Sequence, residues 1–75
     1  MPAQQTGPER ALLVVRQLLL DGRYRAALNA AIELIDRYPD APGPLTLAAR
    51  ASIALGDSPG ARDFAHRATQ LRPRN

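Results

Sequence analysis

The sequence predicts an all-α protein built from two antiparallel helical hairpins. Apolar residues recur at three- and four-residue spacing, as in Ala27, Leu28, Ala31, Leu34 and Ile35, which places them on one helix face. Glycine and proline interrupt the chain at regular intervals, and no stretch shows the alternation of a half-buried strand. The chain also matches itself when it is shifted by 34 residues. Together these observations predict four helices in two equivalent units.

The 34-residue shift superposes the punctuation of the chain together with several small and apolar residues. The superposed pairs are Gly22 with Gly56, Pro39 with Pro73, Pro8 with Pro42, Leu13 with Leu47, Arg16 with Arg50, Ala27 with Ala61 and Ala31 with Ala65. This period is typical of helix-turn-helix repeats, whose units bury their apolar faces by stacking on a neighbour. We therefore predict one unit at 8–41 and a second at 42–75, after an N-terminal tail at 1–7 that we expect to be disordered.

The first unit is predicted to contain helices over 8–20 and over about 23–38. Pro8 is tolerated at a helix start, because the N–H that it lacks has no partner there. Gly22 can adopt the left-handed conformation that ends many helices. Pro39 cannot continue the second helix. The apolar residues of the first helix that are expected to pack on the second are Ala11, Val14, Val15 and Leu18.

The second unit is predicted to contain helices over about 44–55 and from Ser58 onward. A short, stiff connection at 40–44 precedes the third helix, which stops at Gly56. Ser58 is expected to act as the N-cap of the fourth helix, followed by Pro59 in the first turn. The fourth helix has apolar residues at helical spacing, namely Ala61, Phe64, Ala65, Ala68 and Leu71.

Length and composition exclude several classes of protein. The 75 residues form one small domain, and the absence of cysteine excludes disulfides and thiolate metal sites. The ten basic residues are all arginine, and most have an acidic neighbour, so nucleic-acid binding is disfavoured at a net charge of +3. The arginine- and alanine-rich composition indicates a GC-rich bacterial genome. The apolar run at 11–20 contains Arg16 and Gln17, is too short to span a membrane and precedes no cleavage site, which favours a cytoplasmic protein.

A turn glycine, a small residue early in the second helix and a terminal proline recur in both units. These residues are Gly22 and Gly56, Ala27 and Ala61, and Pro39 and Pro73. In these positions, and in Tyr24 at a commonly aromatic place, the chain resembles the tetratricopeptide repeat (TPR) family over residues 8–75. The repeats are degenerate, because Ala11, Leu45, Ala31 and Ala65 stand where the family has large aromatic residues.

The resemblance implies a right-handed superhelical segment. The first helix of each hairpin would line a concave face, and the second helices would form the convex face. Family members bind peptides or proteins at the concave face, so the resemblance implies a protein-interaction or assembly module. Neither Arg16 nor Arg50 matches the family's usual lysine and asparagine clamp, so that specificity is not implied for this chain.

The candidate binding residues lie on the first helix of each unit. They are Leu12, Leu13, Arg16, Leu19, Leu20, Arg50 and Ile53. The first helix is apolar all round, which predicts that its leucine face is covered by another polypeptide. The equivalent arginines are expected in the concave groove, where a guanidinium group can make two hydrogen bonds to a carboxylate. Ordinary exposed leucines and solvated arginines are the alternatives.

No catalytic, cofactor or metal site is predicted. His66 is the single histidine, and no cysteine or second histidine accompanies it. Ser58 is already accounted for as a helix cap, and no glycine-rich phosphate loop occurs. We therefore expect no enzyme activity and no cofactor.

The predicted function is protein or peptide binding through the concave face. One alternative is a homodimer that buries the leucines, because two repeats without a capping helix are fewer than an array usually needs. Another alternative is an auxiliary domain of a larger bacterial enzyme or regulator. The sequence thus leaves the partner open between a foreign peptide and a second copy of the chain.

Overall fold

The computed structural model describes residues 8–71 and contains four helices there. These are α1 (Pro8–Leu20), α2 (Tyr24–Arg37), α3 (Pro42–Ala54) and α4 (Ser58–Leu71). No strand occurs within 8–71, which confirms the prediction of an all-α fold. The predicted disordered tail at 1–7 and the predicted helix end at Pro73 lie outside the described residues.

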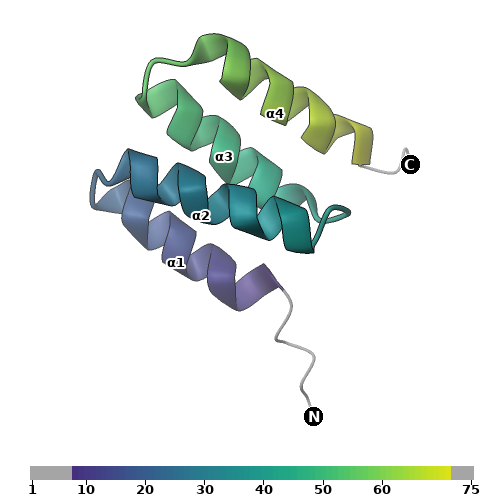
Figure 1. The fold of residues 1–75 in the computed structure, drawn as a ribbon, viewed down its shortest axis with the longest axis horizontal. Helices are drawn as coiled ribbons and strands as arrows, with labels where there is room; N and C mark the ends of the chain where they lie inside the picture. Colours follow the sequence, from purple (N-terminus) through teal and green to yellow (C-terminus); the bar gives the residue numbers. More distant parts are fainter. Residues whose placement is uncertain (1–7, 72–75) are drawn as a thin grey trace.

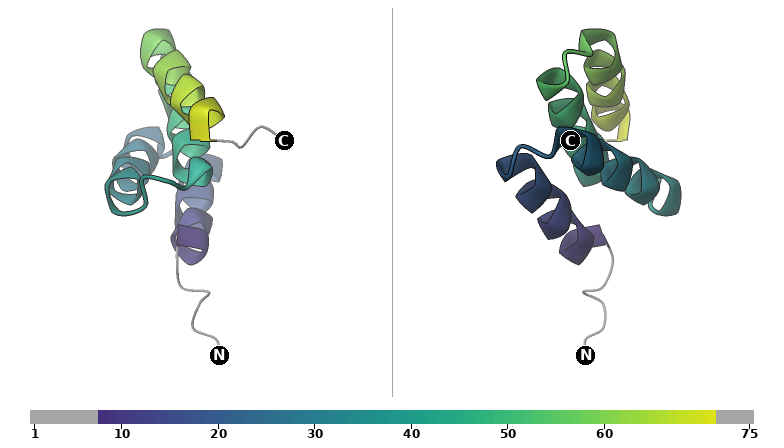
Figure 2. Two further views of the ribbon diagram at one scale, coloured as in Figure 1. Left: turned by 90° about the vertical axis from the view of Figure 1, so that its right-hand side faces the viewer. Right: turned by 60° about the vertical axis from the view of Figure 1, so that its left-hand side comes forward.

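The helices form two hairpins, α1–α2 and α3–α4, that stack through α3. Helix α3 contacts each of the other three helices, α1 also contacts α2, and α4 contacts α3 alone. Figures 1 and 2 show the helices as an open row with α1 and α4 at opposite ends. Within residues 8–71, each end of this row therefore has a face with no neighbouring hairpin.

The core is centred on α3 and is rich in alanine. Helix α3 buries Pro44, Leu45, Leu47, Ala48, Ala49, Ala51 and Ser52, and α2 buries Ala27, Leu28, Ala31, Leu34 and Ile35. By contrast, the buried class contains only Val15 from α1 and only Ala61 from α4. Four alanines, at 27, 31, 48 and 51, are completely inaccessible to solvent. Such small side chains let the helix backbones approach closely, so packing here is sensitive to side-chain volume.

Two equivalent glycine turns join the helices within each hairpin. Gly22 and Gly56 have φ angles of +80° and +84°, the left-handed conformation expected after a helix. The N–H of Arg23 donates to the carbonyl of Leu18 (2.9 Å), and the N–H of Asp57 donates to the carbonyl of Ser52 (2.8 Å). Both bonds span the helix end as in a Schellman motif. The glycine positions in the sequence therefore correctly predict both turns.

Helix α3 begins at Pro42 and not near Pro44 as the sequence predicted. Proline is favoured in the first turn, where its missing N–H leaves no carbonyl unpaired. The connection from α2 is correspondingly short, with the N–H of Ala41 donating to the carbonyl of Tyr38 (3.0 Å). As a result, α1 and α3 begin at equivalent prolines, Pro8 and Pro42.

Asp57, and not Ser58, caps α4. Its Oδ1 accepts a hydrogen bond from the N–H of Gly60 at 3.0 Å, while Ser58 is the first residue of the helix. The carboxylate also complements the positive end of the helix dipole. Arg23, 34 residues earlier, stands at the same place before α2 and makes no side-chain cap bond. The two hairpins therefore share their turn geometry but differ in helix capping.

Candidate functional site

Arg16 and Arg50 line one groove between α1 and α3. The groove is also lined by Leu12, Pro42, Gly43, Thr46 and Leu47. Both arginines are exposed, and each stands four residues after another lining residue, Leu12 on α1 and Thr46 on α3. This spacing places each pair on one helix face. The sequence therefore correctly predicted that these arginines would share one surface.

The groove floor depends on a close approach of α1 and α3. Gly43 lies beneath Leu12, and a Cβ added to Gly43 would stand only 2.9 Å from Leu12 Cδ1. Leu47, farther along α3, is buried. The absence of a side chain at Gly43 therefore permits the groove to close around Leu12 at one end, while the arginines lie on its exposed walls.

The groove has a positive electrostatic character. Its seven lining residues include two arginines and no carboxylate. The hydroxyl of Thr46 donates to the carbonyl of Pro42 at 3.2 Å, so this donor is engaged within α3. The guanidinium groups are therefore the charged donors of the groove. Two such forks beside an apolar floor suit a ligand with carboxylates next to apolar groups.

The leucine face predicted on α1 is divided in two by the structure. Leu12 and Leu19 are partly buried and pack against the core, whereas Leu13 and Leu20 are 64% and 81% exposed. The expectation that two hairpins leave all four uncovered is therefore wrong for Leu12 and Leu19. Because α3 lies against α1, it covers the side of α1 on which these two residues lie.

Ile53 is on α3 but does not line the groove of the two arginines. It is 65% exposed and lies three residues after Arg50. Its equivalent in the first unit is Leu19, which α3 partly covers. Ile53 thus belongs to the open end of the row, where the described chain supplies no further hairpin.

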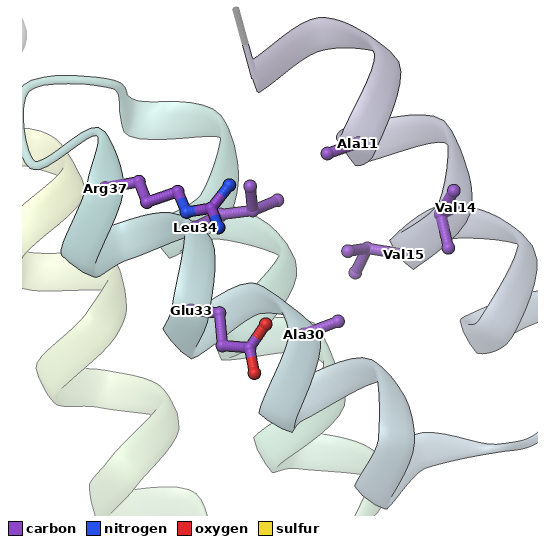
Figure 3. A pocket seen from close by; sticks show the side chains of 7 residues that line it. All are labelled: Ala11, Val14, Val15, Ala30, Glu33, Leu34 and Arg37. Atoms are coloured by element: carbon purple, nitrogen blue, oxygen red, sulfur yellow. The ribbon is translucent and has the colours of Figure 1, made fainter.

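A second groove, which the sequence did not indicate, lies between α1 and α2 at the opposite end of the row. It is lined by Ala11, Val14, Val15, Ala30, Glu33, Leu34 and Arg37, as Figure 3 shows. Val14 is 59% exposed here, so the expectation that it packs on α2 is wrong. The 34-residue shift contained the relevant signal, since it aligns Val14 with Ala48 in the interface between the hairpins.

The remaining polar residues do not form a reactive centre in the part of the chain that is described. His66 is exposed, and the Asp57 carboxylate is engaged at the start of α4. No cluster of three or more His, Cys, Asp or Glu side chains suited to a metal ion occurs within residues 8–71. None of the four helices combines the length and the apolar character needed to cross a membrane.

Comparisons with known proteins add no assignment to this geometry. No family model, curated protein or solved structure gives a significant match to the chain. The functional argument therefore rests on the grooves themselves.

Proposed function

We propose that this chain is a protein-interaction module that binds an acidic peptide segment in the groove between α1 and α3. The observation that carries the proposal is the meeting of Arg16 and Arg50 in one groove without a lining carboxylate. A carboxylate in the ligand would accept paired hydrogen bonds from a guanidinium group. The resemblance of the sequence to TPR repeats supports the same surface, since α1 and α3 are the first helices of the two units.

The surroundings of the arginines favour a ligand that is also partly apolar. Leu12 and Leu47 contribute to the floor, and the exposed Leu13 and Leu20 continue along α1 beside Arg16. Leucines seven residues apart lie on the same side of a helix, so apolar ligand side chains could pack along them. The proposed ligand therefore alternates carboxylates with apolar side chains. The same groove would serve if the chain were an auxiliary domain of a larger bacterial enzyme or regulator.

A labelled eight-residue peptide of alternating Glu and Leu tests the proposal in a fluorescence-polarisation titration. The matched peptide carries Gln in place of every Glu. We expect the Glu peptide to bind at least about tenfold more tightly, and we expect added salt to weaken it because the pairing is exposed. Equal binding of the two peptides, or binding of neither, would contradict the proposal.

Charge reversal locates the peptide on the protein. Arg16→Glu and Arg50→Glu should each weaken the Glu peptide by about tenfold or more, because each replaces an attractive charge with a repulsive one. Arg62→Glu is the matched control, since Arg62 is exposed on α4 and does not line the groove. If Arg62→Glu weakens binding as much as the groove variants do, net charge and not the groove explains the affinity.

A further inference from the structure

The groove between α1 and α2 is an apolar face with charges on one rim. Ala11 and Val14 of α1 and Ala30 of α2 contribute the apolar lining, and Glu33 and Arg37 are exposed on α2 (Figure 3). It is distinct from the groove of Arg16 and Arg50, because neither arginine lines it. The inference drawn from it therefore does not rest on the proposed function.

The chain itself shows how an equivalent face is used. Ala11 and Val14 correspond, 34 residues later, to Leu45 and Ala48. Those two residues are 2% and 0% exposed in α3, the helix that packs on the preceding hairpin. The same face of α1 has no covering helix within residues 8–71, and Val14 remains mostly exposed. A packing helix would therefore bury Val14 as its counterpart is buried.

The charges on the rim are complementary to themselves. Glu33 and Arg37 are one helical turn apart and line the same groove. When two identical helices pair in antiparallel fashion about a two-fold axis, the residues at these positions face each other across the interface. Glu33 of each copy then lies opposite Arg37 of the other. A face with charges of one sign would instead repel a second copy.

We propose that this face is a homodimer interface in which a second copy packs its own α1–α2 groove about a two-fold axis. Val14 and the neighbouring alanines form the apolar centre of the contact. The Glu33 and Arg37 pairs flank that centre on both sides. The groove between α1 and α3 is lined by other residues, apart from the helix that the two grooves share, so the dimer presents two such grooves.

A head-to-tail stack of copies is disfavoured by the same comparison of units. Arg10 and Gln17 stand where α3 has the buried residues Pro44 and Ala51. Continuing the row with α1 of a second copy would bury a guanidinium group and an amide at these positions, which costs free energy without a hydrogen-bonding partner. The two-fold contact avoids this cost, because neither Arg10 nor Gln17 lines the groove.

Sedimentation equilibrium of the full chain from about 10 µM to about 1 mM tests the proposal. We expect the wild type to approach twice the monomer mass as concentration rises. Val14→Gln should weaken dimerisation by at least about tenfold, because it places an amide in the apolar centre. A wild type that stays monomeric over the whole series overturns the proposal.

Charge exchange gives the sharper test. Glu33→Arg alone and Arg37→Glu alone should each be monomeric, because each places like charges across the two-fold axis. An equimolar mixture of these two variants should form a heterodimer, and the double variant should dimerise with itself. Failure of the mixture and of the double variant to dimerise overturns the proposed pairing even if each single variant is monomeric.

Two controls separate this interface from other surfaces. Asp36→Arg makes the same charge change as Glu33→Arg at an exposed α2 position outside the groove, and it should leave the dimer intact. Leu13→Glu probes the exposed leucines of α1 and should also leave the dimer intact. Loss of the dimer in Leu13→Glu but not in Val14→Gln places the interface on the leucines and overturns the proposal. Circular dichroism of each variant verifies that helicity is unchanged.

Discussion

The side chain of Leu12 lies so close to Gly43 that a Cβ on Gly43 would stand 2.9 Å from Leu12 Cδ1. This relationship joins the two helices that line the arginine groove. Glycine is ordinarily unfavourable inside a helix, by about 0.5–1 kcal/mol relative to alanine. Its presence at the second position of α3 is explained by the space that Leu12 occupies.

A double-mutant cycle between these residues should reveal their coupling. Gly43→Ala alone should change the free energy of unfolding little, because the helix gain of about 0.5–1 kcal/mol is offset by displacing Leu12. In the Leu12→Ala background the same substitution should stabilise by about that full amount. Urea denaturation of the four proteins gives the coupling energy. A coupling near zero would show that Leu12 moves aside without cost.

The buried alanines should resist enlargement. Ala27→Leu and Ala61→Leu should each lower the free energy of unfolding by about 1–3 kcal/mol, because their side chains are 0% and 6% exposed at helix contacts. Ala54→Leu is the control, since Ala54 is exposed at the end of α3. Denaturant midpoints that are equal in all three variants would show that Ala27 and Ala61 lie outside the tightly packed part of the core.

Much of the fold follows from the sequence because its signals are local. Glycine at Gly22 and Gly56 adopts a backbone conformation that other residues resist, and proline at Pro8 and Pro42 fits only where no N–H is needed. The meeting of Arg16 and Arg50 follows from the repeat, since equivalent residues of stacked units share a surface.

The parts that were not predicted depend on tertiary packing. Because α1 is apolar all round, its sequence does not specify which leucines face α3 or whether Val14 is covered. Those outcomes depend on how the two hairpins stack. Asp57 and Ser58 are both good capping residues, so the sequence alone does not determine which of them precedes the first helical residue.

Asp57→Ala should destabilise the protein by about 0.5–2 kcal/mol, because it removes the acceptor for the N–H of Gly60. Ser58→Ala should have a smaller effect, since Ser58 is exposed and lies within the helix. Thermal denaturation of both variants distinguishes the two capping residues. A larger loss for Ser58→Ala would restore Ser58 as the cap.

Ser52→Ala should raise the free energy of unfolding by about 1 kcal/mol. The Ser52 side chain is completely buried in α3, and its Oγ has no hydrogen-bonding partner within the described chain. An unpaired buried hydroxyl costs about 1–3 kcal/mol, part of which the small void left by alanine offsets. Chemical denaturation measures the change, and destabilisation by Ser52→Ala would show that the hydroxyl has a partner in solution.

The divided leucine face of α1 gives the last prediction, a contrast between two pairs of substitutions. Leu13→Glu and Leu20→Glu should each change the free energy of unfolding by less than about 0.5 kcal/mol, because both side chains are mostly exposed. Leu12→Glu and Leu19→Glu should each destabilise by at least about 2 kcal/mol, because a carboxylate would be brought against the core. Circular dichroism during urea denaturation measures all four variants.

The contrast also separates folding from binding on this helix. Variants at Leu13 and Leu20 should remain folded, so a loss of peptide affinity in them reports the bound surface itself. Variants at Leu12 and Leu19 should lose affinity together with helicity, because these side chains hold α1 against the core. Equal destabilisation by all four substitutions would mean that Leu13 and Leu20 are covered in solution, most simply by another polypeptide chain.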